Sequence, residues 1–140
     1  MAAHRPEIRV VAAALMRGGL VLAARRGPQQ RQAGLWELPG GKVEPGESDG
    51  RALERELAEE LGIRVEVGRM LAENVHHYPD LTIRLVALAA TLPPDQQPQA
   101  REHDALRWLG PEAVHSLDWA PADIPLLDAV QAALRGSALG

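Results

Sequence analysis

The chain has 140 residues, 46% hydrophobic and 24% charged, which is the composition of an ordinary globular domain. It has no cysteine and no apolar stretch of the ~20 residues that cross a bilayer, and Met1–Arg9 lacks the apolar core of a secretory leader, so we expect one cytoplasmic domain over residues 1–140. A net charge of −4 argues against a binder of nucleic-acid polymers, and favours a polyanionic substrate only if metal ions intervene.

The first half of the chain is predicted to contain apolar strands, glycine-rich turns and one long helix. Arg17-Gly18-Gly19 joins two apolar runs and predicts a β-hairpin. Ser48 is a typical N-cap and Gly62 a typical left-handed terminator, so a helix should begin near Asp49 and stop at Gly62. We expect strands at Glu7–Met16, Leu20–Arg25 and Leu35–Leu38, a loop at 26–34, a break at 39–41, and a loop or short strand at 42–46.

The second half is predicted to contain further strands closed by helical segments. We expect strands at Ile63–Val67, Met70–His77, Leu81–Leu92 and Ala105–Leu109, a loop at 93–99, and helices at Pro111–His115 and Ile124–Leu134. Strands, one helix, more strands and one helix predict an α/β or α+β fold, with the helices packed on a mixed sheet.

The predicted long helix carries three clustered carboxylates. At about 100° per residue, Glu60 lies about 40° to one side of Glu56 and Glu59 about 60° to the other, so all three share one face. Hard oxygen ligands at this density suit Mg²⁺ or Mn²⁺. For the helix alone, a solvated acidic surface is by far the commoner arrangement and the favoured interpretation. The turn Pro39-Gly40-Gly41 just upstream favours the metal site, because glycine lets the backbone approach a ligand and leaves carbonyls free.

The spacing Gly41-x5-Glu47-x7-Arg55-Glu56-Leu57-x-Glu59-Glu60-x-Gly62-Ile63 matches every fixed position of the Nudix box. The chain is therefore similar to the Nudix hydrolases. Residues 32–45 (QAGLWELPGGKVEP), 102–108 (EHDALRW) and 117–127 (LDWAPADIPLL) extend the similarity over most of the chain. They resemble the MutT-type branch, and most of all its CTP pyrophosphohydrolase members.

This resemblance implies the Nudix fold, an α/β/α sandwich around a mixed sheet. It also implies Mg²⁺-dependent hydrolysis of a nucleoside triphosphate to the monophosphate and pyrophosphate, with Mn²⁺ able to substitute. It assigns metal coordination to Glu56, Glu59, Glu60 and the carbonyl of Gly40, orientation of the glutamates to Arg55, and structural roles to Gly41, Glu47 and Gly62.

The resemblance further places Arg26, Leu38 and Asp123 at the substrate, the last two in the base pocket. Guanine-reading MutT enzymes carry Asn where this chain has Asp123. An ionised carboxylate only accepts hydrogen bonds, which favours the amino group of cytosine without excluding 8-oxoguanine. Two other interpretations stay open: Asp123 as the N-cap of the last helix, and Arg26 as a solvent-exposed loop residue.

The base that activates water is either a box glutamate or Glu102, because the family often carries a loop acid at that position; a solvated loop charge is the other interpretation of Glu102. His76 and His77 are adjacent on a predicted strand and should point to opposite faces, so they are not expected to chelate a metal together.

Three functions follow in order. The first is a pyrophosphohydrolase of CTP, dCTP, modified pyrimidine nucleotides or 8-oxo-dGTP, acting in nucleotide-pool sanitisation and so in DNA repair. The second is an ADP-ribose or dinucleoside polyphosphate hydrolase. The third is a nucleotide-binding module without activity, although such modules typically lose box glutamates that this chain retains. We expect a nucleotide as partner, no nucleic-acid polymer or membrane, and a monomer or homodimer.

Overall fold

The computed structural model describes residues 6–139, with side chains through residue 136, so the expectation for the N-terminal segment lies largely outside the described residues. The elements follow one another as β1 (Glu7–Arg17), β2 (Leu20–Arg26), β3 (Trp36–Glu37), β4 (Gly40–Lys42), α1 (Asp49–Leu61), β5 (Glu66–His77), β6 (Thr82–Thr91), β7 (His103–Leu109), the 3₁₀ turns η1 (Pro111–Ala113) and η2 (Ile124–Leu126), and α2 (Leu127–Leu139).

Strand β1 is the centre of a mixed sheet with the order β3-β2-β1-β6-β5. It runs parallel to β6 from Glu7 to Met16. It pairs antiparallel with β4 at Val10–Ala12 and with β2 at its end, Met16 and Arg17. Strand β7 extends the sheet beside β2. The nearly continuous apolar sequence of β1 is typical of a strand that is covered on both faces.

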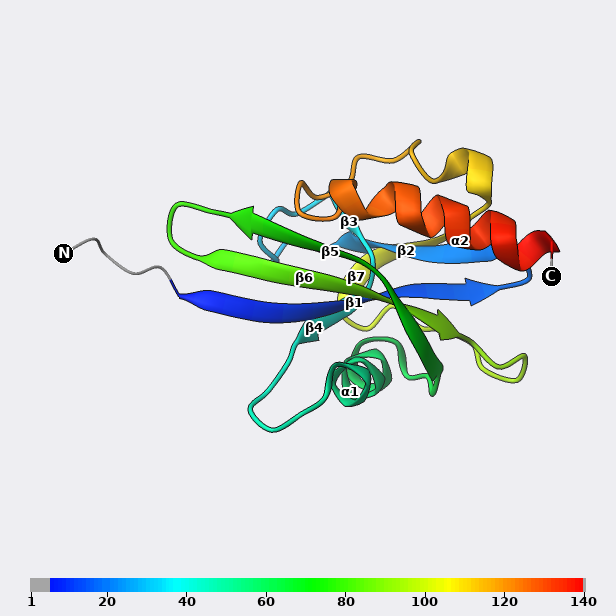
Figure 1. Ribbon diagram of the computed structural model, residues 1–140, viewed down its shortest axis with the longest axis horizontal. Coiled ribbons are helices and arrows are strands. Elements are labelled where there is room, and N and C mark those ends of the chain that lie inside the picture. The colour runs from blue at the N-terminus through cyan, green and yellow to red at the C-terminus, as the bar shows by residue number, and fades with distance from the viewer. Residues whose placement is uncertain (1–5, 140) are drawn as a thin grey trace.

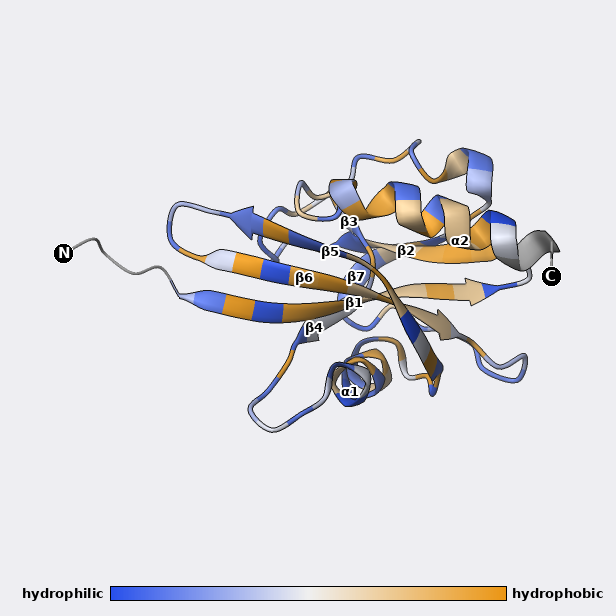
Figure 2. Ribbon diagram, viewed as in Figure 1, coloured by the Kyte–Doolittle hydropathy of each residue, from blue (hydrophilic) through white to orange (hydrophobic). Residues whose placement is uncertain are grey.

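The two helices lie on opposite sides of the sheet (Figure 1). Successive residues of β1 point alternately to the two faces. Val11, Ala13 and Leu15 pack in the core with α1, whereas Ala12 and Ala14 pack in the core with α2. Hydrophobic residues are accordingly concentrated in the strands and on the helix faces turned toward them (Figure 2). This confirms the predicted mixed sheet between helical layers.

The bounds of α1 are those predicted from its capping residues. The Ser48 hydroxyl accepts a hydrogen bond from the backbone N–H of Arg51 at 3.2 Å, and Gly62 ends the helix with a left-handed φ of 67°. The helix is fixed to the sheet by its leucine stripe, and each fully buried leucine contributes about 1.5–3 kcal/mol. These residues are Leu53, Leu57 and Leu61.

Two expectations about strands were wrong. The segments Ile63–Val67 and Met70–His77 are not separate strands: the irregular Ile63 packs into the core, and Glu66–His77 forms one strand, β5. Its pairing with β6 shifts register on both sides of Met70, and these irregularities interrupt the pattern that suggested two strands.

The glycine turn predicted to break the chain instead forms strand β4, which pairs with Val10–Ala12 of β1. Only glycine permits this approach, because a Cβ at Gly40 would lie 1.9 Å from the carbonyl oxygen of Val11. The segment predicted as a helix from Pro111 is a single 3₁₀ turn, η1. Within the described residues, neither helix is long and apolar enough to cross a membrane.

Candidate active site

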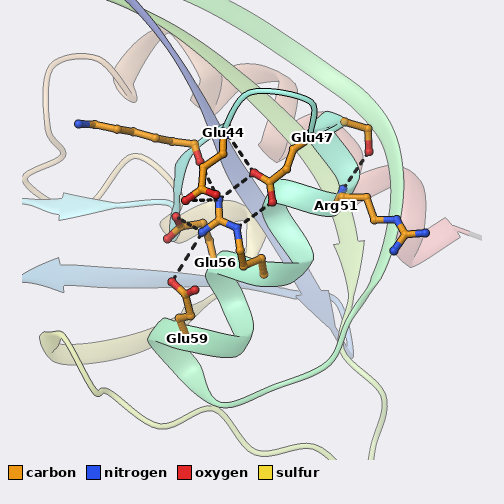
Figure 3. Close-up of polar contacts among 8 residues, drawn as sticks. Glu44, Glu47, Arg51, Glu56 and Glu59 are labelled. Carbon is orange, nitrogen blue, oxygen red and sulfur yellow. Dashed lines mark hydrogen bonds and ion pairs between the residues drawn. The ribbon is translucent and has the colours of Figure 1, made fainter.

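The guanidinium of Arg55 in α1 gathers four carboxylates. Its Nε and Nη2 donate to the two oxygens of Glu47 at 2.8 and 2.9 Å. Its Nη1 donates to Oε1 of Glu56 at 2.9 Å and lies 3.7 Å from Oε2 of Glu59. Glu44 is the most distant, at 3.9 Å from Nη2. Figure 3 shows Glu44, Glu47, Glu56 and Glu59 converging on this one cation.

Glu47 ties the turn before α1 to the helix. Besides its two bonds from Arg55, its Oε1 accepts a hydrogen bond from the backbone N–H of Glu44 at 2.9 Å. The bonds from Arg55, and then this N–H, lower the pKa of Glu47 to about 2. Glu47 is therefore ionised at neutral pH, and Arg55 stays fixed beside the helix carboxylates.

The three helix carboxylates lie in different environments. The side chain of Glu59 is 60% exposed and that of Glu56 is 16% exposed, but Glu60 as a residue is only 6% exposed. Burial raises the pKa of Glu60 well above its usual range, and the negative charges of Glu37, Glu56 and Glu102 add to the effect. Among the described residues, Oε2 of Glu60 has no hydrogen-bond partner. A buried oxygen of this kind is costly unless a cation or donor compensates it.

The carboxylates fit a divalent cation, although they do not enclose one as they stand. Within residues 6–139, no three His, Asp or Glu side chains form a group that could hold a metal ion. Arg55 draws Glu56 and Glu59 toward itself, and like charges keep the carboxylates apart. The uncompensated oxygen of Glu60, with these hard oxygen donors on the same helix face, is suited to Mg²⁺.

A pocket lies near this cluster. Its lining includes Gly40, next to the Gly41 backbone on which Glu56 packs, and Glu37, whose charge raises the pKa of Glu60. Apolar side chains of β1 and β6 form one wall. Arg26, Leu38 and Asp123 also line the pocket. The three residues predicted at the substrate therefore meet in one cavity, although they come from distant parts of the chain.

Asp123 is buried at the pocket and turned toward the sheet. It occupies the N-cap position of η2, but its side chain makes no capping hydrogen bond. Instead, its Oδ2 accepts a hydrogen bond from the backbone N–H of Leu38 at 2.9 Å. The interpretation of Asp123 as a helix cap was therefore wrong. Burial is the main cause that raises the pKa of Asp123 to about 7. The segment before Asp123 is held in place by the backbone of Trp36. The backbone N–H of Trp36 donates to the carbonyl of Asp118, and its carbonyl accepts from the backbone N–H of Ala120, both at 2.8 Å.

Arg26 is not the solvent-exposed loop residue of the alternative interpretation. It lies at the end of β2, and its Nε donates to Oε1 of Glu37 at 2.8 Å. Its Nη1 donates to the carbonyl of Arg31 at 3.0 Å and to Oε1 of Gln32 at 3.2 Å. Gln32 has a left-handed φ of 57°, which is uncommon for a residue with a side chain. The guanidinium is thus held from both the sheet and the loop.

Glu102 precedes β7 and is exposed, yet its charge is close enough to raise the pKa of Glu60. The fold therefore brings this loop acid to the helix carboxylates. The two histidines of β5 make separate contacts, as expected: His77 Nδ1 lies 2.9 Å from the hydroxyl of Thr82, and the ring of His76 packs edge-on against Tyr78.

The NUDIX domain family matches residues 5–130 of the chain. The chain belongs to the Nudix hydrolase family. The sequence expectation of a Nudix fold is confirmed, and three of the four carboxylates around Arg55, those of Glu47, Glu56 and Glu59, stand at fixed positions of the Nudix box.

Named relatives support this membership. The chain is 50% identical to the CTP pyrophosphohydrolase of Escherichia coli over 127 residues, which cover 89% of this chain and 92% of the relative. It is 41% identical to the putative 8-oxo-dGTP diphosphatase 2 of Mycobacterium tuberculosis over 132 residues, or 92% of each. The solution structure of the E. coli ORF135 protein superposes with a TM-score of 0.80 at 47% identity, covering 95% of this chain and 94% of that one.

Sequence reasoning missed two residues of this Nudix site, Glu37 and His103. Glu37 lies in the short strand β3 and bonds with both Arg26 and the buried ring of His103. A buried strand should carry an apolar residue at a pocket-facing position, so the charge of Glu37 beside Trp36 was the available signal. His103 carried no such signal, because its burial depends on how β7 pairs with β2.

Proposed function

We propose that this Nudix hydrolase is a Mg²⁺-dependent nucleoside triphosphate pyrophosphohydrolase that acts on cytosine nucleotides, their modified forms or 8-oxo-dGTP in nucleotide-pool sanitisation. The observation that carries the proposal is that Arg26, Leu38 and Asp123 line one pocket together with Gly40, the residue next to the Gly41 backbone on which Glu56 packs. The pocket suits a base, and the neighbouring carboxylates suit a metal-bound triphosphate. The activities for which the E. coli and M. tuberculosis relatives are named fit this class of substrate.

The residues that would hold the metal are Glu56, Glu59, Glu60 and the carbonyl of Gly40. The uncompensated oxygen of Glu60 supports this assignment, and Mn²⁺ offers similar coordination. When bound, the cation neutralises charge on the phosphoryl oxygens and lowers the pKa of the attacking water. Arg55 keeps Glu56 in a fixed orientation through its charge-assisted hydrogen bond.

In the proposed reaction, the water oxygen forms a bond to the β-phosphorus, and the bond from that phosphorus to the oxygen bridging to the α-phosphate breaks. Nucleoside monophosphate and pyrophosphate leave. A box glutamate or Glu102 accepts the water proton; the proximity of Glu102 to Glu60 supports its candidacy. A Glu102→Gln variant that loses turnover by orders of magnitude but still binds nucleotide and Mg²⁺ would support Glu102 as the base.

Base selection rests on Asp123. Its Oδ2 is engaged by the N–H of Leu38, which leaves Oδ1 for a nucleobase. When Asp123 is ionised, Oδ1 can accept a hydrogen bond from the amino group of cytosine. When it is protonated, the carboxyl group can also donate a hydrogen bond to a ring nitrogen or carbonyl oxygen of a base. Arg26 and Leu38 complete the polar and apolar contacts of the base pocket.

The test is a panel of nucleotides assayed with Mg²⁺ for released pyrophosphate, phosphate and nucleoside monophosphates. We expect pyrophosphate from CTP, dCTP, 5-modified cytosine nucleotides or 8-oxo-dGTP, and a loss of orders of magnitude in the Glu56→Gln variant with the fold intact. Turnover of ADP-ribose or dinucleoside polyphosphates alone would replace this substrate class. Nucleotide binding without any product would indicate a module that only binds.

A further inference from the structure

We propose that His103 is a positioning residue that holds Glu37, and through Glu37 the side chain of Arg26, at the wall of the base pocket. This role rests on the proposed function, because Arg26 can contact a substrate only if the pocket binds a nucleotide. His103 itself does not line the pocket and acts through the two residues that do.

The three side chains form a continuous polar chain across three strands. Nε2 of His103 lies 2.7 Å from Oε2 of Glu37, and Oε1 of Glu37 accepts Nε–H of Arg26 at 2.8 Å. Both carboxylate oxygens are therefore engaged, and the orientation of Glu37 is fixed. Arg26 and His103 are also cross-strand neighbours, just beyond a register shift between β2 and β7. Irregularities of this kind commonly re-aim side chains beside active sites.

Burial defines the state of the His103 ring. Its side chain is only 1% exposed, and its Nδ1 has no hydrogen-bond partner among the described residues. Because an ionised carboxylate only accepts hydrogen bonds, the geometry places a proton on Nε2, from which it is donated to Oε2 of Glu37.

A purely structural role would be served as well or better by apolar side chains. Replacing a buried polar group and its partners by well-packed apolar residues is often neutral or stabilising. The protein instead keeps the largely buried carboxylate of Glu37, with both oxygens engaged by Arg26 and His103, although burying a charge costs free energy. That cost is explained if the three residues serve to aim Arg26 at the substrate.

The first experiment compares His103→Leu with His103→Gln, whose side-chain amide keeps a donor at the position of Nε2. For the nucleotide that the wild type hydrolyses best, we expect an about tenfold higher KM in the leucine variant with kcat within about twofold, because ground-state and transition-state binding are lost together. The glutamine variant should restore most of the affinity. Equal effects of the two substitutions, or a fall in kcat alone, would overturn the proposal.

His115 offers a matched control. It is a half-exposed histidine in the turn after η1, and its Nε2 lies 3.0 Å from the exposed carboxylate of Asp128 in α2; neither residue lines the pocket. His115→Leu should leave KM and kcat unchanged. A rise in KM equal to that of His103→Leu would show that the effect is not specific to the pocket and would contradict the proposal.

The second experiment needs no turnover. In ¹⁵N-labelled wild type, we expect the imidazole of His103 as the Nε2–H tautomer and a slowly exchanging Nε–H signal from Arg26, assigned by its disappearance in Arg26→Lys. The Arg26 signal should persist in His103→Gln and exchange rapidly in His103→Leu. Finding the Nδ1–H tautomer of His103 in the wild type would overturn the positioning role even if the leucine variant folds poorly. An Arg26 signal with the same exchange rate in the wild type and in both variants would overturn it as well.

The two readouts separate this inference from the proposed function. If the wild type hydrolyses no nucleotide but Arg26 depends on His103 as described, the proposed function has failed and the positioning chain stands. If nucleotides are hydrolysed but neither KM nor the Arg26 signal responds to His103, the positioning role has failed and the proposed function stands.

Discussion

The carboxylate of Glu56 packs directly on the bare backbone of Gly41. A Cβ at position 41 would lie 2.3 Å from Cδ of Glu56 and 2.4 Å from its Oε2, closer than any real contact. The glycine of β4 therefore defines where this helix carboxylate can sit, and Arg55 holds it there from the other side.

Gly41→Ala should displace Glu56 and disturb its bond with Arg55. We expect activity to fall by roughly two orders of magnitude, because misplacing a catalytic group by about 1 Å has that effect. Gly50→Ala is the matched control: its Cβ would meet Val67 at an ordinary 3.6 Å in the first turn of α1, and alanine should stabilise the helix by about 0.5–1 kcal/mol. Steady-state kinetics and thermal unfolding of both variants test this; equal activities would show that the contact is dispensable.

Glu60→Gln should remove the affinity for the metal without unfolding the protein. Mg²⁺ should raise the thermal midpoint of the wild type, since a ligand at 100 times its Kd stabilises by about 2.7 kcal/mol, and should leave the variant unchanged. Turnover should fall by about two orders of magnitude or more. Glu54→Gln, an exposed glutamate on the same helix, is the control and should respond to Mg²⁺ like the wild type. The metal assignment is wrong if Glu60→Gln keeps its Mg²⁺ response.

Glu47→Ala should lower kcat, because Arg55 loses the bidentate partner that fixes it beside Glu56. We expect a fall of about tenfold or more, partly recovered in Glu47→Gln, which keeps one acceptor oxygen. Asp49→Ala breaks a comparable bidentate pair, with Arg9 at 2.8 and 2.7 Å, that does not touch the box glutamates. It should leave kcat unchanged. A similar loss of kcat in the Asp49 variant would mean that only the anchoring of α1 is being measured.

Asp123 should make the protein less stable as the pH rises. Burial raises its pKa from 3.8 to about 7, so between these values the folded protein keeps a proton that the unfolded chain releases. The resulting stability is complete below about pH 4 and lost progressively by about pH 7, on the order of a few kcal/mol. Relative to the wild type, Asp123→Asn should lose less stability over this range in denaturant titrations. Parallel curves would contradict the raised pKa; exposed Asp128→Asn should follow the wild type.

The same titration should change substrate preference. Ionised Asp123 only accepts hydrogen bonds, whereas the protonated form also donates. We therefore expect the ratio of kcat/KM for CTP to that for 8-oxo-dGTP to rise between about pH 6 and about pH 8 in the wild type, as Asp123 ionises. In Asp123→Asn the ratio should not vary with pH. A constant wild-type ratio, with both substrates turned over, would remove Asp123 from base selection.

Local signals in the sequence determined the helix, the family and the main arrangement of the fold. Ser48 and Gly62 set the ends of α1 because capping and termination depend on a few neighbouring residues. The spacing of the three glutamates on one helix face follows from helical geometry. The bounds of β4 and β5 did not follow, because pairing with β1 and β6 across the sheet overrode the glycine and turn signals.

Only the tertiary structure determined how strongly the three glutamates of α1 differ in solvent exposure and which residues surround them. Glu60 is buried and Glu59 is exposed because the sheet covers one edge of the acidic face. Leu38 and Asp123 meet across 85 positions, and Glu37 and His103 across 66, through strand pairing and loop packing that no local pattern encodes. The sequence by itself identified the family and the candidate carboxylates of the Nudix box, whereas the pocket exists only once these distant segments are packed together.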